Sequence, residues 1–133
     1  MRKYPIKVSK LQHKAKLLKR TLEEIKDSLI IVEGKRDKEA LKEISLNNVI
    51  AINANPNVAY KLQGYDEAIV LTDFDENGEE LCLRLSAVLE ANNIKPNLEI
   101  RRRLRYILGI KYIEEICTKI KEFEKELTKE KVN

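Results

Sequence analysis

The sequence contains few of the residues from which zinc clusters and disulfide frameworks are built. It has two cysteines, Cys82 and Cys117, and a single histidine, His13. The cysteines lie far apart with no Cys-x-x-Cys pair, so both kinds of framework lack ligands. We therefore expect the protein in a reduced intracellular compartment. We also expect both cysteines to act as small apolar residues in helices, and His13 to be exposed.

Long apolar runs and glycine-rich loops are also missing. No apolar stretch approaches the roughly 20 residues needed to span a bilayer, and the N-terminus lacks the apolar core and cleavage site of a secretory signal. The four glycines do not form the G-x-x-x-x-G-K-[ST] pattern of a phosphate-binding loop. These absences predict a cytoplasmic protein with no membrane partner and no nucleotide hydrolysis by the phosphate-loop route.

The chain has the length and composition of one compact domain with additions at both ends. Its 133 residues are 43% hydrophobic, enough for a single core. Residues 1–27 carry nine Lys/Arg against three acids, residues 28–100 seven against thirteen, and residues 101–133 ten against six. We therefore expect a basic N-terminal helix, an acidic core and a basic C-terminal helical extension. Basic arms suit a polyanionic partner, although lysines that merely solvate amphipathic helices would give the same pattern.

Short apolar runs recur along the chain and predict the strands of a sheet. These runs are 29–32, 49–52, 68–71 and a less regular one at 98–100. Helical spacing fills the intervals, and long stripes at 8–25 and 113–127 predict terminal helices for core packing or a dimer seam. Alternating strands and helices predict an α/β fold with a sheet of about four mainly parallel strands and helices on both faces.

Carboxylates follow closely after two of the predicted strands. Glu33 follows the first strand, and Asp73 and Asp75 follow the third. The carboxyl ends of parallel strands form the ligand-binding edge of such sheets, and ionised groups next to buried runs are costly unless they are paired or bind metal. We therefore predict a site for Mg²⁺, or alternatively Mn²⁺, formed by these three acids. For Asp75 the alternative role of capping the following helix is credible.

Residues 29–37 and 69–78 together resemble the two signatures of the Toprim domain, a strand ending in Glu-Gly and a later strand ending in Asp-x-Asp. The resemblance covers roughly residues 28–100 and implies a Rossmann-like Toprim fold. It implies that Glu33 is the general acid/base and a metal ligand, and that Asp73 and Asp75 bind magnesium.

Three further positions take supporting roles from the same resemblance. Gly34 and Gly78 would occupy close turns, and Asp37 would orient its neighbours rather than bind metal.

Toprim centres support strand cleavage, religation, primer synthesis and hydrolysis, according to the domains around them. The short format resembles the RNA-maturing ribonucleases of the family and small archaeal-type Toprim proteins. We therefore expect Mg²⁺-dependent hydrolysis of phosphodiester bonds in RNA or DNA, with RNA processing as one setting. The alternative is a non-catalytic module that binds nucleic acid or a protein partner within a larger complex, or that forms a homodimer through its terminal helices.

Two groups of basic residues are candidates for binding nucleic acid. The first is the pair next to Glu33, Lys35 and Arg36, which is well placed for a phosphate near the metal. The second is the densest basic cluster of the chain, formed by Arg101, Arg102, Arg103 and Arg105. For the second group, a solvated helix face is an equal alternative.

Overall fold

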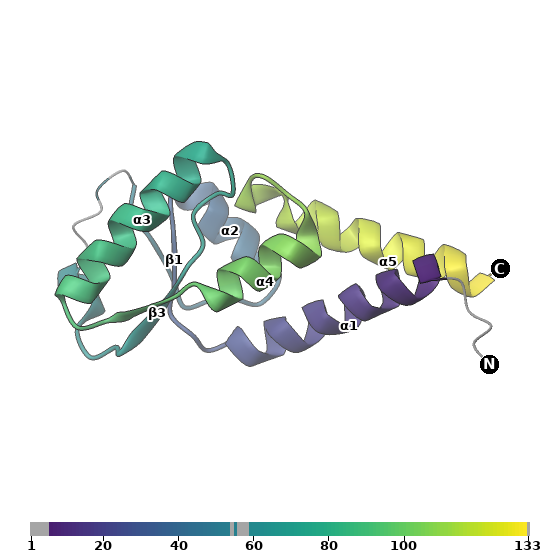
Figure 1. Cartoon of the computed structure of the whole chain (residues 1–133), viewed down its shortest axis with the longest axis horizontal. Coiled ribbons are helices and arrows are strands. Elements are labelled where there is room, and N and C mark those ends of the chain that lie inside the picture. Colours follow the sequence, from purple (N-terminus) through teal and green to yellow (C-terminus); the bar gives the residue numbers. More distant parts are fainter. Residues whose placement is uncertain (1–5, 54, 56–58, 133) are drawn as a thin grey trace.

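The computed structural model describes residues 6–53, 55 and 59–132 (Figure 1). Its strands in this part of the chain are β1 (Ile30–Val32), β2 (Val49–Ala51), β3 (Glu67–Val70) and β4 (Lys95–Asn97). Its α-helices are α1 (Ile6–Ile25), α2 (Lys35–Glu43), α3 (Glu76–Ala91), α4 (Glu99–Leu108) and α5 (Ile116–Val132), and two short 3-10 helices are η1 (Ala59–Leu62) and η2 (Ile113–Glu115).

The strands form one parallel sheet in the order β2-β1-β3-β4. Ile30 of β1 lies opposite Val49 of β2 on one side and Ile69 of β3 on the other. The chain leaves β1 toward β2 in one direction, and leaves β3 toward β4 in the other. This reversal creates a crevice beyond the carboxyl ends of β1 and β3, where ligands bind in open α/β sheets.

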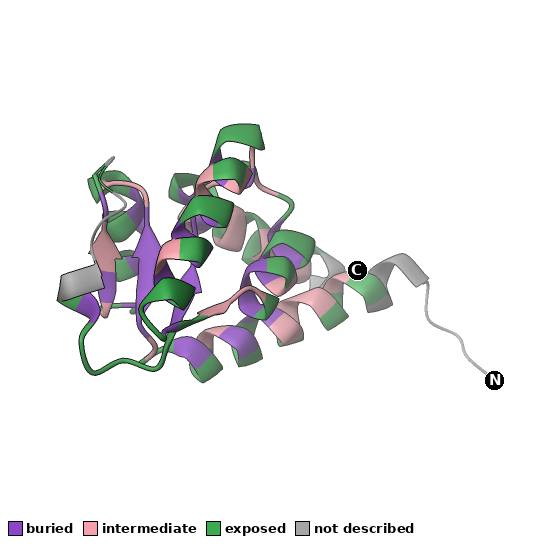
Figure 2. Cartoon of the chain, turned by 60° about the vertical axis from the view of Figure 1, so that its left-hand side comes forward, coloured by how far each residue is buried: buried purple, intermediate pink, exposed green. Residues whose placement is uncertain are grey.

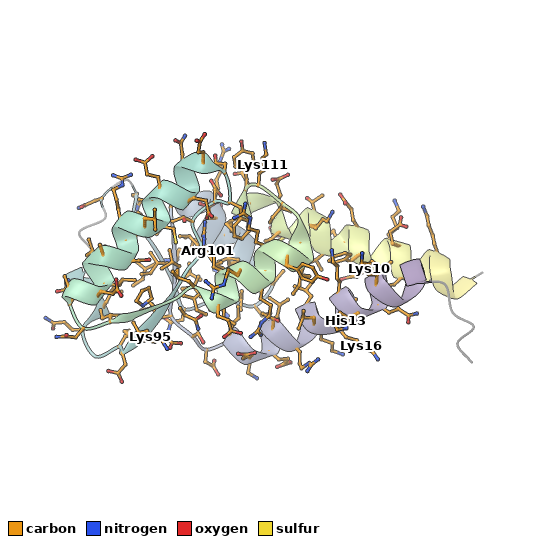
Figure 3. All side chains as sticks on the ribbon, viewed as in Figure 1. Lys10, His13, Lys16, Lys95, Arg101 and Lys111 are labelled. Atoms are coloured by element: carbon orange, nitrogen blue, oxygen red, sulfur yellow. The ribbon has the colours of Figure 1, made fainter. Side chains whose placement is uncertain are left out.

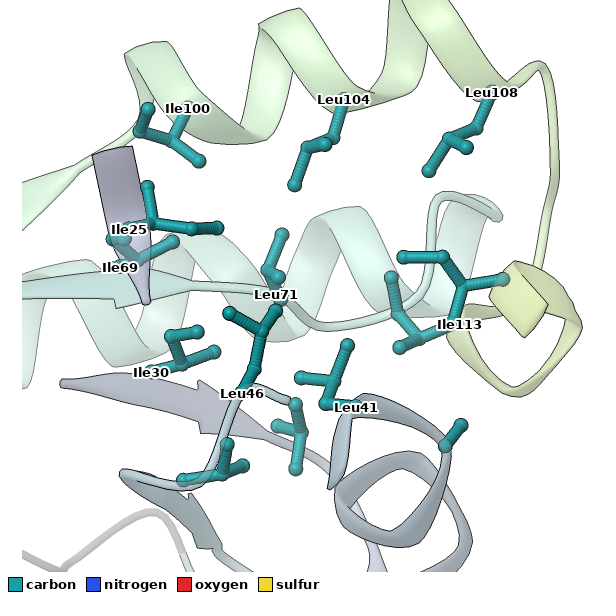
Figure 4. Packing of buried hydrophobic residues seen from close by; sticks show 14 of the residues in the cluster. Ile25, Ile30, Leu41, Leu46, Ile69, Leu71, Ile100, Leu104, Leu108 and Ile113 are labelled. Carbon is teal, nitrogen blue, oxygen red and sulfur yellow. The ribbon is translucent and has the colours of Figure 1, made fainter. Parts of the chain in front are cut away.

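Helices cover both faces of the sheet, because successive side chains of a buried strand point to opposite sides. Ile30, Ile69 and Leu71 belong to a core with residues of α1, α2, α4, η2 and α5 (Figure 4). Ile31 and Val70 belong to a second core with α3. The parallel α/β architecture with helices on both faces is therefore confirmed.

The two terminal helices lie side by side and extend beyond the edge of the sheet (Figure 1). Their apolar stripes face inward, with Leu18 and Ile25 of α1 buried and Ile120 and Phe123 of α5 half-buried against the same core. The outward faces are exposed (Figure 2). No helix among the described residues is both long and apolar enough to cross a membrane. Both cysteines are free, and Cys82, a residue of α3, is buried in the second core.

The fourth strand lies at 95–97 instead of 98–100, so that prediction was wrong. Proline is tolerated in an edge strand, where no N–H is needed for a further neighbour, and Pro96 lies in the edge strand β4 opposite Ala68. The side chain of Asn97 then accepts a hydrogen bond from the N–H of Ile100 at 3.1 Å. The apolar residues after Asn97 therefore begin helix α4 and pack into the core.

Candidate metal centre

Glu33 and Asp73 line one cavity of about 700 Å³ at the carboxyl ends of β1 and β3. Glu33 directly follows the last residues of β1, and Asp73 lies three residues after the end of β3. Because β1 and β3 are hydrogen-bonded neighbours, their ends deliver the two carboxylates to the same crevice. The sequence-predicted meeting of these two acids is thus present in the structure.

The carboxyl group of Glu33 lies in a negatively charged and partly desolvated setting. Burial raises its pKa most, and the nearby charges of Asp73, Asp37 and Asp75 raise it further, although a hydrogen bond from the backbone of Asp73 lowers it. The carbonyl oxygen of Glu33 accepts a hydrogen bond from the N–H of Asn53 at 2.8 Å, which fixes the main chain. The cavity therefore favours the protonated form of Glu33 more than water does.

Asp73 is held by a segment far along the chain. Its Oδ1 accepts a hydrogen bond from the N–H of Ile113 at 2.8 Å. The N–H of the next residue, Phe74, donates to the carbonyl oxygen of Lys111 at 2.7 Å. Burial raises the pKa of Asp73 first, and the hydrogen bond from Ile113 opposes this. The start of η2 therefore positions the carboxylate without neutralising it.

Asp37 lies in the first turn of α2 and lines the same cavity. Its Oδ2 accepts a hydrogen bond from the N–H of Gly34 at 3.1 Å, which holds the turn after Glu33. Burial and then the charge of Asp73 raise the pKa of Asp37.

Asp75 behaves differently from the other acids. It is the N-cap of α3, and its Oδ1 accepts a hydrogen bond from the N–H of Gly78 at 2.8 Å. Across the described ranges 6–53, 55 and 59–132, no three His, Cys, Asp or Glu side chains come close enough to hold one metal ion. The three acids therefore do not form a ready three-carboxylate site: Glu33 and Asp73 share the cavity, and Asp75 caps the helix.

The donor chemistry of the cavity nevertheless fits a hard divalent cation. Mg²⁺ uses oxygen ligands and commonly takes only one or two carboxylates from the protein, with water or phosphate oxygens at its other positions. Burial raises the pKa of Glu33 most, and repulsion from the Asp73 carboxyl group raises it further. A bound cation would remove this repulsion.

Gly78 allows α3 to approach the end of β3 closely. A Cβ atom at this position would lie 2.0 Å from the carbonyl oxygen of Asp73, and the hydroxyl of Thr72 donates to the Gly78 carbonyl oxygen at 2.7 Å. Gly34, in contrast, has an extended backbone, and an added Cβ would meet nothing within 4 Å. The prediction of a close turn therefore has a steric basis at Gly78 and none at Gly34.

Arg101 is only 5% exposed and lies inside the molecule (Figure 3). Its guanidinium donates to the carbonyl oxygens of Thr72 at 2.7 Å and Asp73 at 2.8 Å, and forms an ion pair with Glu79. The prediction that Arg101 contacts nucleic acid is wrong, because its donors are used within the fold.

The rest of the arginine cluster does not form one free surface either. Arg103 pairs with Glu24 at 2.8 Å and with Glu99 at 2.6 Å, and Arg105 pairs with Glu79 at 2.9 Å. Arg102 is exposed. Adjacent positions on a helix point in different directions, so a dense basic run in the sequence is divided among several faces.

Three cations line the acidic cavity: Lys35, Arg36 and Arg84. The first two were predicted from their position beside Glu33, whereas Arg84 was missed. The available signal was helical spacing, because Asn77, Glu80, Leu81 and Arg84 lie at i, i+3, i+4 and i+7 on the helix that follows the Asp-x-Asp pair, and all four line the cavity.

Comparison with known proteins gives consistent matches. A family model of the Toprim domain matches residues 28–104. The UPF0292 protein PH1700 of Pyrococcus horikoshii is 38% identical over 95 residues, which cover 68% of this chain and 72% of the relative. A UPF0292 protein of Methanosarcina barkeri is 35% identical over 97 residues, covering 68% of each chain. A solved structure of a protein from Aquifex aeolicus matches with a TM-score of 0.67 and 29% sequence identity. The match covers 76% of this chain and 95% of the Aquifex chain.

Proposed function

This chain belongs to the Toprim domain family, and from that premise we propose that it is a metal-dependent nuclease that hydrolyses phosphodiester bonds in RNA or DNA. The family match supports a metal-dependent role connected with nucleic acid. The observation that carries the proposal is the shared cavity, where the carboxylates of Glu33 and Asp73 lie among the cations Lys35, Arg36 and Arg84. RNA processing in the cytoplasm is the setting that we propose for this activity.

Glu33 and Asp73 would hold Mg²⁺ or Mn²⁺, with water or phosphate oxygens at the other positions of the ion. When bound, the ion would polarise the scissile phosphate and stabilise the leaving oxygen. Glu33 accepts and returns the proton in this proposal, because its carboxyl group lines the cavity beside Asp73. Asp73 keeps its position through the N–H of Ile113.

The cations of the cavity bind the substrate phosphate. Lys35 and Arg36 are exposed at the start of α2, directly after the Glu33-Gly34 turn, and Arg84 lies on the opposing wall formed by α3. None of the three forms an ion pair with another described residue. They therefore keep their donors for a phosphate group between the two helices.

A non-catalytic binding module is the second candidate. It is favoured by the N-cap role of Asp75 and by the fact that the described residues do not present three clustered metal ligands. In that case the cavity would hold nucleic acid or a partner within a larger complex, without turnover.

Cleavage assays separate the two candidates. Labelled structured RNA and single- and double-stranded DNA are incubated with the protein in Mg²⁺, in Mn²⁺ and in chelator, and products are followed on gels. We expect cleavage only with metal, and a loss of roughly 10²-fold or more for Glu33→Gln, which removes the proton-transfer group.

The matched control is Glu90→Gln, the same chemical change at an exposed position near the end of α3. It should leave the rate unchanged. Absence of cleavage of every substrate, with nucleic-acid binding that Glu33→Gln does not alter, would establish the binding module instead.

A further inference from the structure

A second hollow, of about 570 Å³, lies between α2 and the edge strand β2. Its walls include Lys35, Lys38 and Lys42 of α2, Ala51 of β2, and Lys61 at the end of η1. Four of its eight lining residues are lysines and one, Glu39, is an acid, so the charged groups that line the hollow are mainly positive. We name it the lysine groove.

The lysine groove and the acidic cavity share one lining residue. Lys35 lines both hollows, and it lies two residues after Glu33. A polymer lying in the groove would therefore reach the carboxylates of the cavity at one end.

The lysines of α2 are arranged to follow a linear polyanion. Lys35, Lys38 and Lys42 lie at i, i+3 and i+7 and share one helix face. All three are exposed and form no ion pair within the described residues. They span about 10 Å along the helix, which equals about three nucleotide steps of a stacked strand.

Protection of the sheet edge does not explain this arrangement by itself. Lysines that protect an edge are placed on the edge strand. Strand β2 has the sequence Val-Ile-Ala, and the lysines lie on α2 and η1, at the sides of a concave surface. In comparison, Arg101, Arg103 and Arg105 are engaged in ion pairs within the fold.

We infer that the lysine groove binds the sugar-phosphate backbone of a nucleic-acid strand and directs it into the acidic cavity. The inference rests on the proposed function for the identity of the polymer, and it adds the path by which the polymer approaches. Lys38 and Lys42 contact phosphates remote from the reacting bond, and Lys35 marks the entrance to the cavity.

The test measures binding in EDTA, so that cleavage cannot contribute. Fluorescein-labelled 20-nucleotide RNA and DNA of one sequence, each single-stranded and as a duplex, are titrated and followed by anisotropy at several salt concentrations. We expect Lys38→Ala/Lys42→Ala to weaken binding about tenfold and to reduce the salt slope by about 1.4 for a single strand, at about 0.7 per lost phosphate contact. The RNA and DNA arms identify which backbone is preferred.

The matched control is Lys121→Ala/Lys125→Ala on α5, which removes two exposed lysines at the same i, i+4 spacing away from the groove. It should bind like the wild type. Circular dichroism melts check that both double variants fold, as expected for alanine at exposed helix positions.

The inference would be overturned if both double variants weakened binding equally, or if the groove variant did not weaken it. It would also be overturned if the wild type did not bind nucleic acid. Displacement of the oligonucleotide by an equal charge concentration of a polyglutamate peptide would also overturn it, and would assign the groove to an acidic protein. Groove-dependent binding without any cleavage would support the inference while the nuclease proposal fails. If cleavage at subsaturating substrate did not depend on Lys38 and Lys42, the nuclease proposal would be supported and the groove inference would fail.

Discussion

Two charged regions lie at the end of β3. In one the charge is paired with groups of the fold, and in the other like charges lie together. On one side, Arg101 is buried with its donors on the carbonyl oxygens of Thr72 and Asp73 and on Glu79. On the other side, the carboxylates of Glu33 and Asp73 share a cavity in which burial and mutual repulsion raise the pKa of Glu33. Removing one member of a buried ion pair destabilises the fold, whereas like charges held together in a cavity indicate a binding site.

The largest expected effect on stability comes from replacing Arg101, the paired charge. Arg101→Met should lower the free energy of unfolding by about 3–5 kcal/mol, because it leaves the carbonyl oxygens of Thr72 and Asp73 without their side-chain donor. Guanidinium denaturation measures the change. Arg102→Ala, at the exposed neighbouring position, should stay within about 0.5 kcal/mol. Similar losses for the two variants would remove the distinction between the regions.

The next largest effect is expected at Gly78, where α3 packs closely against the end of β3. Gly78→Ala should cost about 3 kcal/mol, because its Cβ would lie 2.0 Å from the carbonyl oxygen of Asp73 and the backbone must move. Gly34→Ala is the matched control, since an added Cβ there meets nothing within 4 Å. Urea denaturation of both variants checks the comparison, and equal stability would contradict the steric role of Gly78.

Divalent metal should increase stability only through the carboxylates of the acidic cavity. At ten times its Kd, Mg²⁺ should stabilise the wild type by about 1.4 kcal/mol, because it binds the folded state only. Asp73→Asn should reduce this gain, and Arg102→Ala should keep it. Thermal melts over a Mg²⁺ titration provide the measurement. An undiminished gain in Asp73→Asn would exclude this residue as a ligand.

The smallest effect is the pH dependence of stability without metal. Raised pKa values mean that the folded state binds protons more tightly than the unfolded state, so stability falls as pH rises from the ordinary carboxyl range through the raised values. Glu33→Gln and Asp37→Asn should therefore raise Tm at neutral pH by roughly 2–4 °C and flatten this dependence. Lower Tm values for both variants would show that the acidic side stabilises the fold.

Sequence pattern alone located three of the four strands and the acids that follow them. The runs before Glu33 and Asp73 are apolar without interruption, and such runs identify buried parallel strands because both faces of the sheet are covered. The order of strands and helices then placed both acids at one edge. The pattern misplaced the fourth strand, because the edge strand has the sequence Lys-Pro-Asn and contains no apolar run.

The sequence by itself thus determined the α/β architecture, the crevice and the pairing of Glu33 with Asp73, since these depend on local periodicity and on the direction of strands. Only the tertiary structure decided which charges remain available. Arg101 finds its partners at Glu79, Thr72 and Asp73, between 22 and 29 positions away, and Ile113 reaches Asp73 across 40 positions. Contacts of this range depend on how α4 and η2 pack against the strand ends, and neighbouring residues along the chain do not encode that packing.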